Sequence, residues 1–258
     1  DLIYFDNTAS CATSTAESLP CLFSQFPRAT FDVKEADNYT NVLDSMVKGG
    51  FQVEWRDNNS GCKGVCARVR AVEYKAPQPN NELCPKSYCY DEIMLTDLAN
   101  KLRGVRKDTA IVFHQVGSHG PAYAERYPPR FEIFKPVCNS NRLQSCTRQE
   151  IVNAYDNSIA YTDFVLARQI ELLRAAEDRV DSLLIYVSDH GESLGEKNIY
   201  LHGMPYTFAP VTQKQVPLLM WASKGYRERT GLNMQCLRKA AGEYFSHDNL
   251  YHTVLGAA

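Results

Sequence analysis

The sequence lacks any long hydrophobic run, any cluster of like charges and any internal repeat. No stretch reaches the roughly 18 consecutive apolar residues that a transmembrane helix requires. The 30 Asp and Glu residues nearly balance the 28 Lys and Arg residues, and no polybasic segment is present. The charge pattern therefore gives no indication of a nucleic-acid partner or of a basic patch for membrane surfaces.

No low-complexity tract or linker divides the 258 residues either. With 44% hydrophobic and 22% charged residues, the composition is that of an ordinary globular protein. We therefore expect residues 1–258 to form a single soluble domain, and a monomer. The chain starts without Met on a strand-like segment, and residues 250–258 read as a helix that is cut short. We expect a fragment that is truncated at both ends.

Zinc-ribbon C-x-x-C pairs are absent, although the chain contains nine cysteines. Eight of them form four pairs that are close in sequence: Cys11/Cys21, Cys62/Cys66, Cys84/Cys89 and Cys138/Cys146. Close pairs in loop-like sequence predict disulfides and an oxidising compartment. A cytosolic protein with scattered thiols is the alternative. Cys236 is left over in an amphipathic segment, where we expect it to be a buried small hydrophobe.

Apolar segments of strand length alternate with amphipathic helical segments along the chain. Strands are predicted at 2–5, 51–55, 109–113, 183–187 and 216–221, and helices at 17–23, 38–48, 91–102, 147–176, 232–245 and 250–258. This alternation predicts an α/β fold with a mostly parallel central sheet and helices on both faces. The apolar strand at 183–187 is expected to be buried in the middle of that sheet.

Polar turns follow the strands at 183–187 and 109–113. The first strand leads into Asp189-His190-Gly191, and the second into His114 and then His119-Gly120. His202 is followed by Gly203, so four of the six histidines lie in Gly-bearing turns. Open α/β sheets bind ligands at the carboxyl ends of their strands, and Asp and His are zinc ligands. We expect the turns to converge on a metal or a phosphate. The alternative is an Asp that caps a turn and histidines that are solvated.

Hydroxyl residues crowd the segment between the first strand and the helix at 17–23. A loop that enters a helix N-terminus can bind phosphate, and a Thr or Ser there can act as a nucleophile when its pKa is lowered. Ordinary capping of the helix by Ser14 or Thr13 is the alternative. Position alone does not tell which hydroxyl would react.

Two further groups of residues are left with open alternatives. The loop after the strand at 51–55 contains Asn59 and Lys63, which could bind a phosphate ester or could decorate a surface loop. His247 and His252 are expected to be core or capping residues. His114 has no role that the sequence assigns.

Several motifs occur together and in order over nearly the whole chain. They are Ser10-Cys11-Ala12-Thr13-Ser14-Thr15-Ala16, Cys62-Lys63-Gly64-Val65-Cys66, His114-x4-His119-Gly120-Pro121, Ser188-Asp189-His190-Gly191-Glu192-Ser193 and Leu201-His202-Gly203. In these motifs the sequence resembles the phosphoethanolamine transferases that modify lipid A. That family includes the mobile colistin-resistance enzymes and belongs to the alkaline-phosphatase/sulfatase superfamily.

The resemblance implies a zinc enzyme with a threonine nucleophile. Residue by residue, the nucleophile falls on Thr15, and the zinc ligands fall on Asp189 and His190, with Thr15 also touching the metal. His119 and His202 match residues that hold the phosphoryl group or a second zinc. The positions of Asn59 and Lys63 match substrate-binding residues.

The resemblance also implies a reaction. Phosphoethanolamine would pass from phosphatidylethanolamine to a lipid A phosphate through an intermediate on threonine. Core sugars and other envelope glycans are alternative acceptors. The expected location is the Gram-negative periplasm, as the soluble part of an inner-membrane protein whose amino-terminal membrane helices are not in this sequence.

The sequence departs from the family pattern at one zinc ligand. The family has a Glu in a Gly-Glu-Thr turn upstream of the position of Thr15, and this sequence contains no counterpart. Glu192 does not replace it, because it follows Asp189 and His190. An inactive fragment or a binding module is therefore the alternative to an enzyme. A sulfatase proper would need C/S-x-P-x-R, which does not occur around Cys11.

Overall fold

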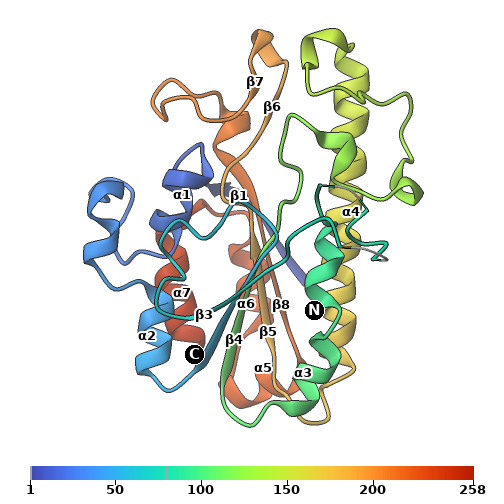
Figure 1. Ribbon diagram of the computed structural model, residues 1–258. Helices are drawn as coiled ribbons and strands as arrows, with labels where there is room; N and C mark the ends of the chain where they lie inside the picture. Colours follow the sequence, from blue (N-terminus) through green and yellow to red (C-terminus); the bar gives the residue numbers. More distant parts are fainter. Residues whose placement is uncertain (1, 79–80, 86) are drawn as a thin grey trace.

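The computed structural model describes residues 2–78, 81–85 and 87–258 (Figure 1). The strands are β1 (Leu2–Ala9), β2 (Gln52–Asp57), β3 (Arg70–Glu73), β4 (Thr109–His114), β5 (Leu183–Val187), β6 (Ser193–Leu194), β7 (Tyr200–Leu201), β8 (Gln215–Ala222) and β9 (Phe245–Ser246). The α-helices are α1 (Thr15–Leu22), α2 (Val42–Lys48), α3 (Leu98–Gly104), α4 (Arg148–Arg174), α5 (Lys224–Thr230), α6 (Met234–Ala240) and α7 (Leu250–Ala257).

The α/β class is confirmed, and the sheets are mixed. In the described residues β3-β2-β4 form one sheet, in which β2 runs parallel to both neighbours. The other sheet has the order β5-β8-β1-β9, and β8 runs antiparallel to β5 and to β1. A parallel return would need a crossover connection such as a helix. Residues 188–214 contain the β6–β7 hairpin and short 3₁₀ turns instead. The prediction of a mostly parallel sheet therefore holds for the first sheet and not for the second.

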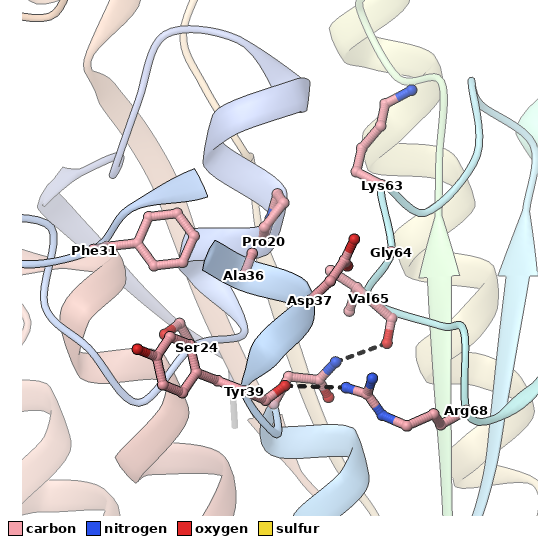
Figure 2. A pocket seen from close by; sticks show the side chains of 11 residues that line it. Pro20, Ser24, Phe31, Ala36, Asp37, Tyr39, Lys63, Gly64, Val65 and Arg68 are labelled. Carbon is pink, nitrogen blue, oxygen red and sulfur yellow. Dashed lines mark hydrogen bonds between the residues drawn. The ribbon is translucent and has the colours of Figure 1, made fainter. Parts of the chain in front are cut away.

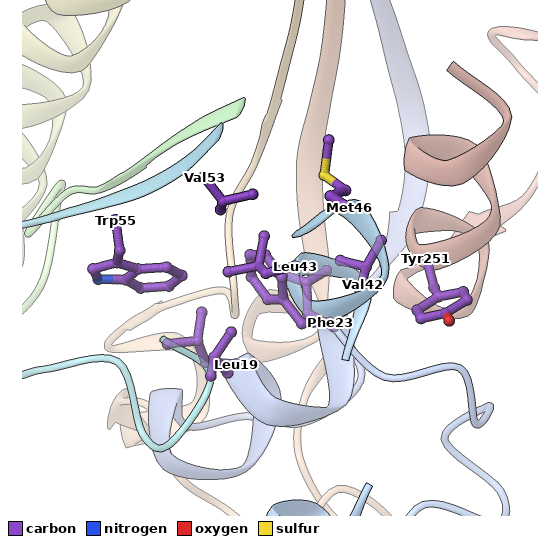
Figure 3. Close-up of a cluster of buried hydrophobic side chains, with 10 residues drawn as sticks. Leu19, Phe23, Val42, Leu43, Met46, Val53, Trp55 and Tyr251 are labelled. Atoms are coloured by element: carbon purple, nitrogen blue, oxygen red, sulfur yellow. The ribbon is translucent and has the colours of Figure 1, made fainter. Parts of the chain in front are cut away.

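Helices cover both faces of the strands, as predicted. Along β4, Ala110 and Val112 pack into a cluster formed by α1, α2, β2 and Tyr251 of α7 (Figure 3). The alternate residues, Ile111 and Phe113, pack on the other side in a cluster with α3 and α4. This alternation with a period of two is what a strand between two helical layers requires.

Some local predictions need correction. The helix predicted over 91–102 is divided into a 3₁₀ segment (Asp91–Leu95) and α3. The residues of β5 are only partly buried, and β5 lies at one end of its sheet order rather than in the middle. Cys236 is exposed and free. In α6 the residues that pack on the sheet are Met234 and Leu237, so Cys236 lies outside the apolar stripe.

The four predicted cysteine pairs all form disulfides. The Cys11–Cys21 bond closes the segment that enters α1 and spans most of that helix. The other bonds close shorter rings outside that segment, and they are Cys62–Cys66, Cys84–Cys89 and Cys138–Cys146.

The Cys138–Cys146 disulfide braces the start of α4. Cys138 is buried, and its amide donates to the carbonyl of Glu150 in the first turn of that helix at 3.1 Å. Cys146 is only partly buried and immediately precedes Thr147, the N-cap residue of α4. Both cysteines pack in one apolar cluster with Ile151. Cys146 therefore has a structural role, which is to attach the preceding excursion of the chain to α4.

No helix in the described residues combines the length and the apolar character that are needed to cross a membrane.

Candidate functional site

Thr15 is the first residue of α1 and is nearly buried, with 8% of its surface exposed. Its hydroxyl oxygen lies 3.3 Å from Nε2 of His190. The alternative of helix capping is not supported, because Ser14 makes no side-chain cap bond. Nor does the hydroxyl of Thr13 cap the helix, since it donates to the carbonyl of Met204. The first backbone N–H groups of α1 have no partner within the helix and present its positive end beside Thr15.

Asp189 and His190 lie in the turn that leaves β5. His190 is buried, and its Nδ1 donates to the carbonyl of Gly191 at 2.9 Å, which leaves the lone pair of Nε2 free to bind a cation. The Oδ2 atom of Asp189 is 3.7 Å from this Nε2 and is buried without a hydrogen-bond partner. A buried carboxylate oxygen without a partner is costly, so this position calls for a cation.

Gly191 is required by a close approach of two backbones. A Cβ built on Gly191 would come within 2.1 Å of the carbonyl oxygen of Thr212. The amide of Gly191 donates to the carbonyl of Gln213 at 3.1 Å. The backbone that Gly191 approaches is the 3₁₀ turn Val211–Gln213, which holds the Asp189–His190 turn in place.

His119 and His202 join His190 in one cluster of imidazole rings. The ring centroids of His190 and His202 are 4.2 Å apart, those of His119 and His202 are 4.8 Å apart, and those of His119 and His190 are 6.3 Å apart. The turns that contain His119, His190 and His202 therefore lie close together, and their meeting at a metal or a phosphate stays a prediction. Nδ1 of His119 donates to the carbonyl of Gly120 at 2.6 Å, which leaves its Nε2 available.

The two added histidines differ in charge. Burial lowers the pKa of His119, and its positively charged neighbours His202 and Arg126 lower it further. Burial also lowers the pKa of His202, but the carboxylate of Glu192, 3.1 Å from its Nδ1, raises it by more, so the net pKa lies above the ordinary value. The cluster thus pairs a neutral imidazole with one that favours its charged form, which suits the binding of a phosphoryl group.

Asn59 and Lys63 lie in the loop after β2. The side-chain amide of Asn59 donates to the carbonyl of Gln115, which places this loop beside the segment that leads to His119. The ammonium of Lys63 donates to the carbonyl of Ser60 at 2.6 Å. In the described part of the chain, neither side chain forms a hydrogen bond or ion pair with Thr15, Asp189 or the three histidines. Their role in substrate binding stays a prediction.

A pocket lies next to this loop, between α1, the 3₁₀ segment Val33–Asn38 and the Cys62–Cys66 turn (Figure 2). Lys63 extends away from the other side chains of the pocket (Figure 2). Arg68 at its edge is already paired with Asp44 at 2.6 Å. Of the candidate site residues the pocket includes Lys63, but it includes neither Thr15 nor Asp189 nor any of the clustered histidines.

Three histidines lie outside this cluster, and two of them, His114 and His252, have no link to the site in the part of the chain that the structure describes. His114 is buried and pairs with Asp57 at 2.9 Å, so it has a structural partner. His252 is exposed, which contradicts a core role, and it lies edge-on to Tyr251.

The paired cysteines stabilise the fold as disulfides and do not supply metal ligands. Cys11, Cys21 and Asp248 are close enough to share an ion. However, Cys11 and Cys21 are bonded to each other, so no thiolate is available there. The same holds for Cys146, whose sulfur is bonded to Cys138. These residues support the candidate site only through the segments that they join.

Glu192, Ser18 and His247 also take part in this site, although no role was predicted for them there. Glu192 holds His202, and its position two residues after His190 was visible in the sequence. Ser18 donates to the carbonyl of Asp189. His247 bonds to backbone atoms on two other segments. Ser18 and His247 act through main-chain partners that are distant in sequence, and no motif indicates such contacts.

The profile of the sulfatase family matches residues 1–258. The phosphoethanolamine transferase EptA of Escherichia coli strain K12 is 44% identical over 99% of this chain, which spans 47% of the relative. Phosphatidylethanolamine transferase Mcr-1 of Escherichia coli is 41% identical over 97% of the chain, or 46% of the relative. This chain thus covers about half the length of these curated relatives.

Among solved structures, the soluble domain of lipooligosaccharide phosphoethanolamine transferase A from Neisseria meningitidis has a TM-score of 0.94 and 42% identity. The match covers 99% of this chain and 76% of that one.

Proposed function

Because this chain belongs to the sulfatase family, and within it to the phosphoethanolamine transferases, we propose that the whole protein transfers phosphoethanolamine from phosphatidylethanolamine to a lipid A phosphate. The observation that carries the proposal is the contact between the Thr15 hydroxyl and His190 beside the unpartnered carboxylate of Asp189. A buried alcohol, a basic nitrogen and an unsatisfied acid in one place form the centre of a phosphotransferase with a threonine nucleophile.

The residues present fit a zinc ion. Asp189 offers a carboxylate oxygen, His190 an imidazole nitrogen and Thr15 a hydroxyl oxygen, and all three donor types bind zinc. When bound there, zinc would act as a Lewis acid that lowers the pKa of the alcohol. Zinc in proteins usually has four ligands, and the family that this sequence resembles uses a Glu upstream of the position of Thr15, for which this sequence contains no counterpart. His119 and His202 are proposed to hold the phosphoryl group or a second zinc.

The reaction has two displacement steps at phosphorus. In the first, Oγ1 of Thr15 attacks the phosphorus of phosphatidylethanolamine, and the bond from phosphorus to the glycerol oxygen breaks. The proton that Thr15 loses ends on the departing diacylglycerol, and phosphoethanolamine remains bonded to Thr15. In the second step an oxygen of the lipid A phosphate attacks the same phosphorus and the bond from phosphorus to Oγ1 of Thr15 breaks. The proton that the attacking phosphate loses returns to Thr15. Lys63 and His202, whose pKa is raised by Glu192, stabilise the negative charge on the phosphoryl oxygens.

The acceptor and the location complete the proposal. The name of Mcr-1 identifies phosphatidylethanolamine as that relative's substrate, which supports the donor. The acceptor is proposed to be a lipid A phosphate, with core sugars or other envelope glycans as alternatives. The four disulfides support an oxidising compartment, which we propose is the Gram-negative periplasm, with residues 1–258 as one catalytic domain of an inner-membrane protein.

Expression of the full-length protein in a lipid A-producing host tests the proposal. We expect mass spectrometry of the lipid to show phosphoethanolamine on lipid A phosphates with the wild type and none with Thr15→Ala. Thr13→Val is the matched control, because it removes a hydroxyl of the same loop that faces Met204 rather than His190. Transfer that survives Thr15→Ala would exclude the threonine nucleophile. Phosphoethanolamine on core sugars alone would correct the acceptor.

A further inference from the structure

His247 connects the two segments that build the candidate site. It follows β9, is 2% exposed, and uses both ring nitrogens. Its Nδ1 accepts a hydrogen bond from the amide of Cys11 at 3.0 Å, and its Nε2 donates to the carbonyl of Ser188 at 3.0 Å. Cys11 opens the loop that delivers Thr15, and Ser188 immediately precedes Asp189 and His190. One imidazole therefore bridges the segment of the alcohol and the segment of the acid.

Only one protonation state of His247 satisfies both partners. An amide N–H needs an acceptor and a carbonyl needs a donor, so the ring must be neutral with its proton on Nε2. Burial lowers the pKa of His247 to about 4, which keeps it neutral at physiological pH. A charged ring would direct a second N–H at the amide of Cys11. The bridge is therefore a fixed connection at neutral pH and not a switch.

The surroundings hold the imidazole in place from several sides. The two residues before it pair with the end of β1, where Phe245 lies opposite Thr8 and Ser246 opposite Ala9. The ring of Phe245 packs edge-on against Phe5 at 5.2 Å. Ser18 of α1 adds a parallel link, because its hydroxyl donates to the carbonyl of Asp189 and lies 3.4 Å from Nδ1 of His247. These interactions thus fix the segments that carry Thr15 and His190 relative to each other.

We propose that His247 is a positioning residue that sets the spacing between the Thr15 alcohol and the Asp189–His190 turn. The inference rests on the proposed transfer reaction. In the described residues its ring nitrogens form hydrogen bonds with main-chain atoms of both segments and lie beside the hydroxyl of Ser18, but they form no hydrogen bond with the hydroxyl of Thr15 or the carboxylate of Asp189. His247 therefore acts by positioning Thr15 and the Asp189–His190 turn. A displacement of about 1 Å in a reacting pair can cost on the order of 100-fold in rate.

Three substitutions in the full-length enzyme test this role. His247→Ala removes both hydrogen bonds. His247→Asn leaves an acceptor near the position of Nδ1, and His247→Gln leaves a donor near the position of Nε2. We expect His247→Ala to lower kcat by about 100-fold with KM for phosphatidylethanolamine changed less than about twofold. We expect His247→Gln to recover about tenfold of that loss, because Ser188 keeps its donor. Val165→Ala, in the cluster on α3 and α4, is the control for lost stability.

A second readout does not depend on zinc or on turnover. Hydrogen exchange of the Cys11 amide in metal-free protein reports its bond to Nδ1 directly. We expect this amide to lose protection in His247→Ala and to keep most of it in His247→Asn. Equal protection in wild type and His247→Ala would overturn the bridge. A kcat in His247→Ala no lower than in a Val165→Ala variant of equal melting temperature would overturn the positioning role. If wild type itself transfers nothing, the proposed reaction fails, while the exchange pattern still decides whether the bridge exists.

Discussion

At the residue scale, Asp189 has the least satisfied environment in the site. Its Oδ2 atom is buried without a hydrogen-bond partner. A carboxylate placed in this way destabilises the metal-free protein and stabilises the protein that holds a cation. The same group should therefore have opposite effects on folding in the absence and presence of zinc.

Asp189→Asn tests this balance through the free energy of unfolding. In chelator we expect the variant to be at least as stable as wild type, and up to about 2 kcal/mol more stable. With zinc, wild type should gain stability and the variant should not. The matched control is Asp57→Asn, because both oxygens of the Asp57 carboxylate accept hydrogen bonds: Oδ2 from His114 and Trp55, and Oδ1 from the amides of Asn59 and Gly61. That variant should lose stability in both conditions. If Asp189→Asn is less stable than wild type in chelator, the Asp189 carboxylate is not an unpartnered buried group in the metal-free protein, and this account is contradicted.

Asp57 also predicts a dependence of stability on pH. Burial raises the pKa of this carboxyl, but hydrogen bonds from His114 and Trp55 lower it by more, to about 2. The unfolded chain titrates near 3.8, so the contribution of Asp57 is fully present above that pH and is lost as the pH falls through 2. A shift of this size corresponds to about 2 kcal/mol. Between pH 5 and pH 2, wild type should lose about that much more stability than Asp57→Asn in denaturant titrations. Parallel curves would contradict the assignment.

At the scale of elements, the Cys11–Cys21 disulfide encloses both the loop and the helix of Thr15. Its ring spans a sequence separation of 10 residues, for which chain entropy gives about 3 kcal/mol of stabilisation. Replacing both cysteines by Ser should remove about that much stabilisation. It should also lower the rate of transfer at temperatures where the variant is still folded. The Cys84–Cys89 pair, which packs beside Ile93 and Met94, is the control. Its double Ser variant should lose about 2 kcal/mol and retain transfer. Equal transfer in the two variants would show that the first ring does not position Thr15.

The elements also show what sequence patterns can and cannot predict. Strands β4, β5 and β8 and helix α4 were predicted because long apolar periodicity identifies them. No pattern in the sequence indicated β3 and α5. Residues 70–73 make a short strand that is mostly exposed, and in α5 only Tyr226 is buried, so neither produces a hydrophobic period. The prediction that Cys236 is buried was wrong because a small apolar side chain fits either the buried or the exposed side of a helix.

At the scale of the whole molecule, the convergence of the turns was predictable and the path of the chain was not. Asp189, His190, His119 and His202 could be grouped because each follows a strand or sits in a Gly-bearing turn. The antiparallel direction of β8 depends on how residues 188–214 fold back, which strand patterns do not encode. The bridge made by His247 depends on backbone atoms that lie 236 and 59 residues away, and so required the structure.

The central claim is that Thr15 carries phosphoethanolamine between donor and acceptor. The most direct measurement is mass spectrometry of the zinc-loaded full-length enzyme after incubation with phosphatidylethanolamine and without any acceptor. We expect a phosphoethanolamine adduct on the peptide that contains Thr15, which disappears when lipid A is added. An adduct on another residue, or steady transfer to lipid A with no adduct on Thr15 at any time, would contradict the claim.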